Sequence, residues 1–247
     1  MQTIDLNCDM GEGMGNDGDI MPFISSANIA CGYHAGDNDT MQKTVELALK
    51  YGVAIGAHPG FADKQNFGRL EQLLPPQQVY DLVVEQIYIL QKVAFGFGAK
   101  LHHVKPHGAL YNMAAKDKAM AEAIAKAVKD VDGTLVLYGL YNSFLISSAQ
   151  EVGSKTANEV FADRRYNTNG RLVARNIQGA VIEDADKAVE QVLNMVLHKT
   201  VTTIEGEIIP VQAQTVCLHG DGKHAAAFAK LVNGAMADNG VGIKVPC

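Results

Sequence analysis

The chain has 247 residues, of which 47% are hydrophobic and 19% are charged, and its formal net charge is −6. This length and composition predict one α/β domain over residues 1–247 with a large buried core. The negative charge disfavours nucleic acid and anionic membranes as partners. No apolar run reaches the roughly 18 residues that cross a bilayer, and the N-terminus has no signal-peptide pattern, so we expect a cytoplasmic protein.

Four cysteines occur in the chain, and none forms a C-x-x-C pair, which argues against a zinc ribbon or a redox motif. A chain of this length with so few cysteines is typical of a reduced cytosolic protein. Cys8, Cys31 and Cys217 lie in apolar, strand-like stretches, and we expect each to be a small buried hydrophobic residue. Cys247 ends the chain, where we expect it to be frayed.

Short β-type runs alternate with longer amphipathic runs in the first half of the chain. The expected strands are residues 3–8, 27–31, 53–57 and 101–104. The spacing of apolar residues predicts helices over residues 39–51 and from Pro75 to about Phe95. Gly52 is the expected C-cap of the first of these helices.

The second half continues the same alternation. The expected strands are residues 134–138, 157–161 and 215–218, and the expected helices are 119–128, 143–152, 185–197 and 225–239. Residues 200–211 are typical of a hairpin that turns at Glu205-Gly206. Alternating strands and helices predict a parallel sheet with helices outside it. About seven such units favour a barrel, and a doubly wound open sheet is the alternative.

Ionisable side chains with glycine or proline neighbours follow six of the expected strands. These segments are residues 7–13, 30–37, 57–60, 103–108, 161–166 and 218–222. In parallel α/β folds the C-terminal ends of the strands meet on one face, and active sites are built there. We therefore expect the six segments to converge, and a site that draws on nearly every strand favours the barrel over the open sheet.

Four of the eight histidines follow a strand and lie near a glycine: His34, His58, His107 and His219. A lone histidine in such a place is commonly a structural hydrogen-bonding residue. Four at equivalent positions suit metal ligation, proton transfer or binding of a polar substrate. His103 shares strand parity with Lys105 and is placed to point inward. His198 and His224 fall on expected helices, where we expect them to be solvated.

Five carboxylates belong to the strand-end segments: Asp9, Glu12, Asp37, Asp163 and Asp221. Asp37 opens an expected helix, so an N-cap role suits it at least as well as a catalytic one. Asp5, inside the first strand, would need a partner if buried, and Lys105 is one candidate. Lys105 and Arg164 are the cations expected in the site, where either suits a carboxylate or phosphate group. A structural ion pair is an equal alternative for Lys105.

Several common catalytic motifs are missing from the sequence. There is no G-x-x-x-x-G-K-[ST] phosphate loop, and the glycines of residues 11–15 fail G-x-G-x-x-G because Asn16 stands at the last position. There is also no G-x-S-x-G elbow and no H-E-x-x-H pair, which argues against a serine-triad hydrolase and a thermolysin-type protease. The chemistry that remains for this site is attack of water on a carbonyl-type centre, assisted by an acid–base pair or by a metal.

The strand-end blocks together resemble the LamB/YcsF family. The resemblance rests on residues 5–7, 11–13, 26–37, 58–61, 66–69, 103–112, 159–164 and 216–221, in the same order from residue 3 to about 240. It implies a distorted TIM-like (β/α)7 barrel related to the glycoside hydrolase/deacetylase superfamily. It also implies a hydrolase role as the A subunit of a bacterial ATP-dependent 5-oxoprolinase, which opens 5-oxo-L-proline to L-glutamate together with B and C subunits. One departure is Arg165, where the family has glycine, and we expect a surface residue there.

The resemblance also suggests roles for individual residues. The catalytic candidates are Asp9, Glu12, His107 and Asp221. The substrate- or phosphate-binding candidates are Asn7, Asn28, Lys105, Asp163, Arg164 and His219. Superfamily relatives often hold a divalent metal, Mg or Zn, with one Asp and two His, here Asp9, His34 and His58. ATP is the expected nucleotide. The rival hypotheses are a metal-dependent carbohydrate or amide deacetylase acting alone, and a non-catalytic subunit that binds a small acid.

Overall fold

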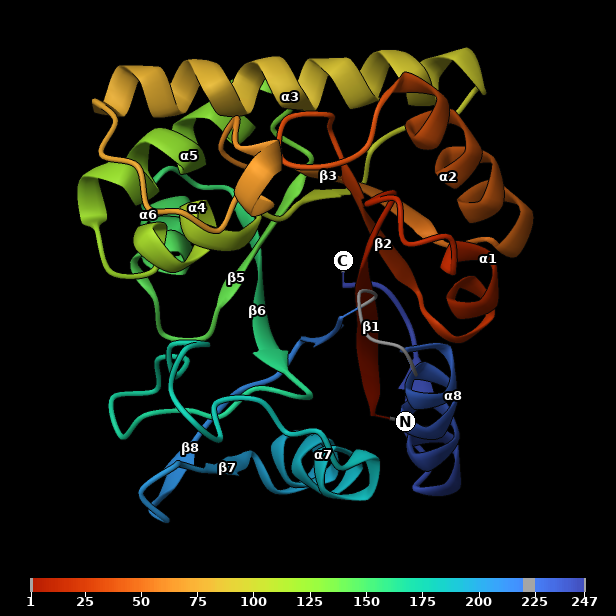
Figure 1. Cartoon of the computed structure of the whole chain (residues 1–247), viewed down its shortest axis with the longest axis vertical. Coiled ribbons are helices and arrows are strands. Elements are labelled where there is room, and N and C mark those ends of the chain that lie inside the picture. The colour runs from red at the N-terminus through yellow and green to blue at the C-terminus, as the bar shows by residue number, and fades with distance from the viewer. Residues whose placement is uncertain (1, 220–224, 247) are drawn as a thin grey trace.

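The computed structural model describes residues 2–219 and 225–246 and has a closed parallel barrel at its centre (Figure 1). The barrel strands are β1 Thr3–Met10, β2 Ser26–Ala30, β3 Ala54–His58, β4 His103–Val104, β5 Val136–Leu140, β6 Lys155–Phe161 and β9 Thr215–Leu218. Each pairs with the next in parallel, and β9 pairs back with β1 from Asp5↔Thr215 to Cys8↔Leu218. The predicted seven-stranded barrel is therefore confirmed, and the open sheet is excluded.

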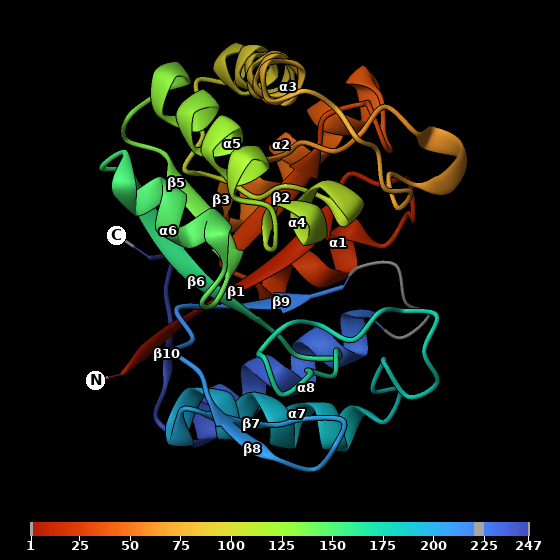
Figure 2. The same cartoon turned by 90° about the vertical axis from the view of Figure 1, so that its left-hand side faces the viewer.

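Helices cover the outside of the barrel, with α2, α3, α5 and α6 on one side and α7 and α8 on the other (Figure 2). Their bounds are α2 Asn38–Tyr51, α3 Pro76–Gly96, α5 Lys118–Val131, α6 Phe144–Glu151, α7 Ala185–Leu193 and α8 Ala225–Asp238. All six lie where the apolar spacing predicts them. No helix in the described part of the chain is long and apolar enough to cross a membrane.

Shorter elements complete the fold. The expected hairpin is present as β7 Thr200–Thr202 and β8 Ile208–Pro210, while β10 Gly242–Ile243 adds a parallel strand beside β1. The helix expected over residues 185–197 continues past α7 as a π-helical turn at Asn194–His198. The unpredicted helical elements are α1 Asp17–Ile20, α4 Gly108–Ala114 and the 3-10 turns Met21–Phe23 and Lys64–Asn66. These pieces are too short to carry a clear periodic pattern, which is why the sequence did not predict them.

Helix ends and faces follow local chemistry. Asp37 accepts a hydrogen bond from the Thr40 amide and is the N-cap of α2, so its capping role is confirmed. Gly52 ends α2 with φ of 68°, a left-handed conformation that glycine adopts without strain. In α3 the buried residues recur every three or four positions, from Val79 through Val83 and Ile87 to Leu90. Burial of each of these side chains contributes about 1.5–3 kcal/mol.

The interior of the barrel is polar, whereas most such barrels are filled with aliphatic side chains. Asp5 is fully buried and accepts hydrogen bonds from the hydroxyls of Ser25, Ser26 and Thr215 at 2.6–2.7 Å. Burial raises the pKa of Asp5, although these hydroxyl donors oppose the rise. Lys105 was one expected partner of Asp5, and that expectation is wrong, because hydroxyl groups satisfy the carboxylate instead.

Candidate functional site

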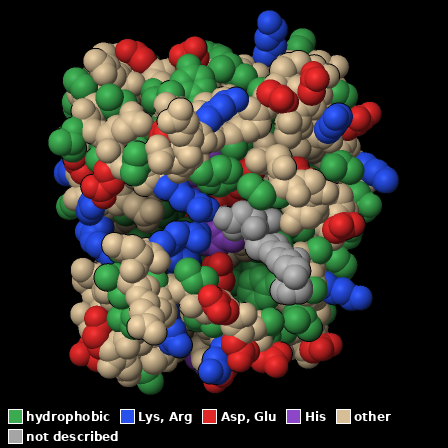
Figure 3. Space-filling view, viewed as in Figure 1, with side chains coloured by type: hydrophobic (Ala, Val, Ile, Leu, Met, Phe, Trp, Pro, Cys, Tyr) green, Lys and Arg blue, Asp and Glu red, His purple; other side chains and the backbone are tan. Residues whose placement is uncertain are grey.

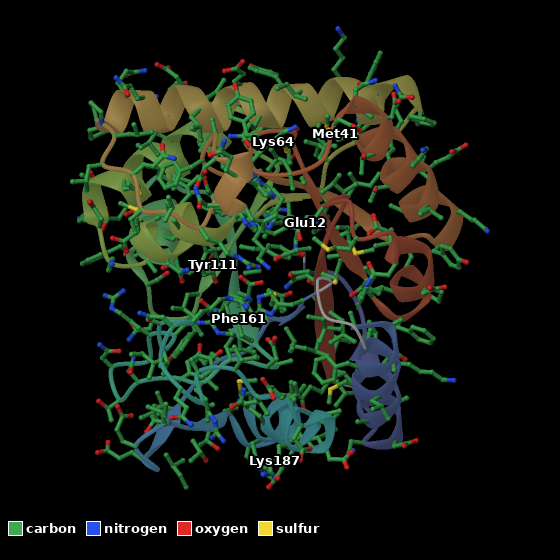
Figure 4. All side chains as sticks on the ribbon, in the orientation of Figure 1. Glu12, Met41, Lys64, Tyr111, Phe161 and Lys187 are labelled. Carbon is green, nitrogen blue, oxygen red and sulfur yellow. The ribbon has the colours of Figure 1, made fainter. Side chains whose placement is uncertain are left out.

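A cavity of about 350 Å³ opens at the C-terminal ends of the barrel strands. Asp9 from β1, His58 from β3, Phe161 from β6 and His219 after β9 line it. Figure 4 shows Glu12, Tyr111 and Phe161 in the central region of the view. The strand-end segments therefore converge as the parallel topology requires, within the residues that the structure describes.

Three histidines and one carboxylate form a compact group on one wall, which we call the histidine cluster: Glu12, His34, His58 and His107. The rings of His34 and His107 stack with centroids 3.8 Å apart, and His58 meets both rings edge-on. The Glu12 Oε1 atom lies 3.4 Å from His34 Nε2 and 3.4 Å from His107 Nδ1. One ligand atom from each side chain lies within 4.8 Å of the others, so the four can converge on a single ion or proton.

Glycines allow this close approach. A Cβ atom at Gly60 would lie 2.7 Å from His34 Nδ1, and one at Gly68 would lie 2.8 Å from His34 Cβ. Gly68 also has φ of 63°, which disfavours any side chain there. The loop after β3 therefore needs glycine at both positions to hold the histidine cluster together.

Hydrogen bonds fix the tautomers of two rings in the histidine cluster. His58 Nδ1 lies 2.7 Å from the Lys105 carbonyl oxygen, and His107 Nε2 lies 2.8 Å from the Phe67 carbonyl oxygen. A carbonyl only accepts, so each of these nitrogens is assigned a proton. The remaining lone pairs, on His58 Nε2 and His107 Nδ1, face each other at 2.9 Å. Two lone pairs at this distance repel, so the arrangement favours a shared proton or a bound cation.

Burial keeps the His34 and His107 rings of the histidine cluster neutral. It lowers the pKa of His34 well below its usual value, and it lowers the pKa of His107 to about 3, with a further contribution from His58. Both ring nitrogens of His34 are buried and have no hydrogen-bond partner among the described residues. Neutral imidazole is the form that accepts a proton or binds a metal.

The histidine cluster fits a divalent metal by its chemistry. Three imidazoles and a carboxylate are donors that Zn and similar ions accept. The His58 and His107 rings donate their other N–H groups to backbone carbonyls, which is the usual support for metal-binding histidines. Two residues of the expected Asp9–His34–His58 set belong to this cluster. Asp9 lies 3.4 Å from His58 Nε2 but belongs to a second group of potential ligands with Cys217 and His219.

Lys105 is buried beside the histidine cluster and is paired with two carboxylates. Its Nζ lies 2.9 Å from Asp9 Oδ1, 2.9 Å from Glu159 Oε1 and 3.1 Å from Cys217 Sγ. Burial disfavours the charged amine of Lys105. The attraction of Asp9, Cys217 and Glu159 outweighs this cost and holds the pKa of Lys105 well above its usual value. The structural ion pair, one of the two alternatives for this lysine, is therefore present.

Asp9 remains ionised at the edge of the cavity. Burial alone would raise its pKa, but His58 and Lys105 hold the pKa of this carboxyl well below its usual range. Asn28 donates to Asp9 Oδ1 at 2.8 Å and to Asn7 Oδ1 at 2.7 Å. Asn7 and Asn28, both expected to bind substrate, are fully buried, and Asn28 holds Asp9 while Asn7 holds Asn28.

The opposite wall carries the remaining predicted binding residues. Asp163 accepts a 2.7 Å hydrogen bond from His219 Nδ1, and Arg175 donates to His219 Nε2 at 2.9 Å. Burial would raise the pKa of Asp163, but His219 and Arg175 outweigh it and lower that pKa. Arg164 lines the cavity and is almost fully buried. Asp163 thus orients His219 at the rim, and His219 in turn contacts Arg175.

Several site residues were not predicted as such: Tyr111, Glu159, Arg171, Arg175 and Cys217. Cys8, Cys31 and Cys217 are buried as expected, but Cys217 also contacts Lys105. The strand parity that Glu159 shares with Phe161 was an available signal, whereas Tyr111 lies on the unpredicted helix α4.

Other expected positions fall away from the cavity. Arg165 is half-buried and lines a second hollow beside Lys187 and Glu190 of α7. His198 is exposed, as expected. Asp221, His224 and Cys247 lie outside the described residues, so the catalytic role of Asp221 stays a prediction.

Comparisons with known proteins agree with this architecture. The model of the LamB/YcsF family matches residues 4–246. A protein of Tolumonas auensis that is named as the A subunit of 5-oxoprolinase is 52% identical over 249 residues, which cover 99% of each chain. The crystal structure of a lactam utilization protein from Thermus thermophilus has a TM-score of 0.93 and 40% identity, covering 99% of this chain and 100% of that one. A peptidoglycan deacetylase from Bacillus subtilis, 13% identical with a TM-score of 0.51 over 98% of this chain and 86% of its own, shares the fold.

Proposed function

The chain belongs to the LamB/YcsF family, and on that basis we propose that it is the A subunit of an ATP-dependent 5-oxoprolinase. This hydrolase opens the lactam of 5-oxo-L-proline to L-glutamate. The observation that carries the proposal is the 52% identity to the A subunit of a 5-oxoprolinase over 99% of both chains. We further propose that it works in the cytoplasm together with B and C subunits.

The cavity suits a small cyclic amide that carries a carboxylate. Its volume of about 350 Å³ accommodates a five-membered lactam and leaves room for a second group. One wall supplies the histidine cluster and Asp9, and the other supplies cations, so the two ends favour opposite kinds of ligand group. We propose that the lactam carbonyl lies toward the histidine cluster and that anionic groups lie toward the cations.

Proton transfer is the task of the histidine cluster in this proposal. In the reaction, ATP transfers a phosphoryl group to the lactam oxygen and leaves as ADP, and a first water attacks the activated carbon. The C–N bond then breaks, which frees the amino group, and a second water hydrolyses the resulting acyl phosphate to L-glutamate and phosphate. His107 is neutral and has a lone pair on Nδ1, so it is our candidate for the base that takes the proton from water. A pKa of about 3 makes the resting ring a weak base, so the proposal requires Glu12, 3.4 Å from that nitrogen, to stabilise the imidazolium that forms. Asp9 is the weaker candidate because Lys105 Nζ lies 2.9 Å from its Oδ1 and His58 Nε2 lies 3.4 Å from its Oδ2, so both carboxylate oxygens already face partners.

A metal-dependent deacetylase that acts alone is the second candidate function. The observation in its favour is that the histidine cluster has the donors of a divalent-metal site. Glu12, His34, His58 and His107 would hold the ion. When bound, such an ion supplies Lewis acidity toward a carbonyl oxygen. A non-catalytic subunit that only binds a small acid is the third candidate.

One assay separates these candidates. Glutamate formation from 5-oxoproline is measured with this chain alone and with the B and C subunits, with and without MgATP. A parallel series contains 1,10-phenanthroline, which removes zinc-like ions and leaves MgATP intact. We expect turnover only in the complete complex with ATP. Deacetylation of an acetylated sugar by the chain alone, abolished by phenanthroline, would support the second candidate instead. Tight binding of 5-oxoproline without turnover under any condition would support the third.

A further inference from the structure

Nearly all arginines of this protein line one cavity. The sequence has five arginines among its 21 basic residues, and four of the five line the cavity at the strand ends: Arg69, Arg164, Arg171 and Arg175. Of the lysines, Lys105 and Lys116 line it. Figure 3 shows Lys and Arg side chains gathered around a hollow, with histidine visible at its inner end. A chain of net charge −6 therefore has a cation-rich cavity.

Three of these arginines come from residues 162–184, which connect β6 to α7, and we call Arg164, Arg171 and Arg175 the arginine bank. Their hydrogen bonds go to uncharged groups, namely the Val173 carbonyl, the Ala115 carbonyl and His219. Within residues 2–219 and 225–246, none of the three forms an ion pair with a carboxylate within 4.0 Å. Asp163 is near enough to interact electrostatically with Arg164 and Arg175, but among the described residues no carboxylate pairs directly with the arginine bank, so three cations face one carboxylate there.

Arg164 is the most deeply buried residue of the arginine bank. It is only 4% exposed, and its Nε has no hydrogen-bond partner among the described residues. Burial, with repulsion from Arg175, lowers its pKa to about 10. A buried cation with an unsatisfied donor is costly unless a ligand supplies the counter-charge. The end of the cavity at Arg164 therefore favours a bound anion.

From this geometry we infer that the arginine bank is a binding site for a phosphoryl group. Guanidinium groups donate in a planar fork that matches phosphate oxygens, and three of them exceed the single charge of a carboxylate. Lys105 is not part of this site, because Asp9 and Glu159 already neutralise it. The inference rests on the proposed function, whose reaction supplies phosphoryl groups. It adds that the arginine bank holds such a group on this chain, in place of a glycine-rich phosphate loop.

The test measures binding of defined probes to the full-length chain by isothermal titration calorimetry. The probes are inorganic phosphate, MgATP and 5-oxoproline. Arg175→Gln and Arg171→Gln should each weaken phosphate binding about tenfold or more, since each removes a charge-assisted hydrogen bond. Arg165→Gln is the matched control, because Arg165 lies on the same segment but lines a different hollow. Binding should also weaken when NaCl rises from about 50 mM to about 300 mM.

The outcomes separate the sources of the phosphoryl group. Binding of both phosphate and MgATP, lost in the two variants, supports a site for the group whatever its source. Binding of MgATP alone, lost in the same variants, assigns the site to the nucleotide. No binding of either probe, or an equal loss in Arg165→Gln, overturns the inference. A loss of binding that affects only 5-oxoproline also overturns the inference, because it would assign the arginine bank to the substrate carboxylate.

Two further comparisons keep the result unambiguous. Arg171 also holds the Ala115 carbonyl, so if Arg171→Gln fails to fold, the exposed Arg175 carries the test through Arg175→Gln and Arg175→Lys. The lysine variant keeps the charge and loses the fork, so its binding should fall between the other two. A chain that binds phosphate but shows no turnover with its partner subunits keeps this inference and refutes the proposed function. Turnover without phosphate binding does the reverse.

Discussion

His107 has the features of a proton acceptor at the scale of a single side chain. Its Nε2 donates to the Phe67 carbonyl, its Nδ1 lone pair faces His58 and lies 3.4 Å from Glu12 Oε1, and burial keeps the ring neutral by lowering its pKa to about 3. We predict that His107→Ala lowers kcat for ATP-dependent glutamate formation by about a hundredfold or more. Thermal unfolding followed by circular dichroism should show that the variant still folds. His198→Ala, at an exposed position, is the control, and unchanged turnover in His107→Ala would remove His107 from the chemistry.

Lys105 neutralises two buried carboxylates. We predict that Lys105→Met, which keeps the length of the side chain and removes its charge, lowers the free energy of unfolding by about 3–5 kcal/mol, because Asp9 and Glu159 are left without a counter-charge. Urea denaturation measures this change. Lys126→Met breaks an exposed ion pair with Asp130 and should have no measurable effect. Equal stability of the two variants would contradict this role of Lys105.

His103 should make stability depend on pH. It is fully buried, and desolvation lowers its pKa well below the usual 6.5. Below about pH 6.5 the unfolded chain therefore binds a proton at this residue that the folded chain does not, so stability falls as pH falls. We predict that this one group removes about 1 kcal/mol of stability between about pH 7.5 and about pH 5.5.

Urea denaturation at the two pH values tests this effect of His103. His103→Gln should show a smaller loss of stability on acidification than the parent chain, whatever its stability at neutral pH. His198→Gln, which changes an exposed histidine, should keep the parent's pH dependence. An unchanged loss in His103→Gln would mean that His103 is protonated in the folded state as well.

Strand parity predicted most of the polar wall, because Asp9, Lys105 and His107 follow strands whose ends must meet. The contacts of Glu12 with His34 and His107 could not be predicted from the sequence, because they depend on how the loops approach each other. Arg171 and Arg175 were also missed. They lie on an irregular segment, where no periodicity indicates which side chains turn toward the cavity.

At the scale of elements, the barrel strands and the outer helices could be predicted because burial imposes a period on each. The connection from β6 to α7 could not, since only two isolated bridges among the described residues, Arg164↔Val181 and Tyr166↔Leu172, give it regular pairing. Tyr166 fastens this segment to the barrel, because its hydroxyl accepts a 2.7 Å hydrogen bond from the Phe161 amide. The segment that carries the arginine bank is therefore anchored at the end of β6.

The loop after β3 controls the histidine cluster through a close contact. We predict that Gly60→Ala lowers turnover of the complete complex at least about tenfold, because the new Cβ would lie 2.7 Å from His34 Nδ1 and 3.3 Å from His107 Cβ. The histidines must then shift, and the geometry of proton transfer changes.

Gly18→Ala provides the control for the Gly60 variant. Gly18 lies in the short helix α1, and a Cβ there meets nothing within 4 Å among the described residues. Initial rates of glutamate formation should be unchanged in this variant. Equal rates for Gly60→Ala and the parent chain would mean that the histidine cluster tolerates displacement.

At the scale of the whole molecule, the cavity is richer in cations than the chain that forms it. The chain has a net charge of −6, yet the cavity gathers four of its five arginines opposite the histidine cluster. The net charge alone could not predict a cation-rich cavity. That residues 1–247 form one domain stays a prediction. The arrangement of the cavity supports a reaction with two anionic groups, a substrate carboxylate and a phosphoryl group.

The most direct test of the proposed function is the initial rate of L-glutamate formation from 5-oxo-L-proline by the chain with its B and C subunits. We predict that glutamate appears only with MgATP and that each turnover releases one phosphate. Omission of this chain should abolish the product. ATP-independent glutamate formation, or an undiminished rate without this chain, would contradict the proposed function.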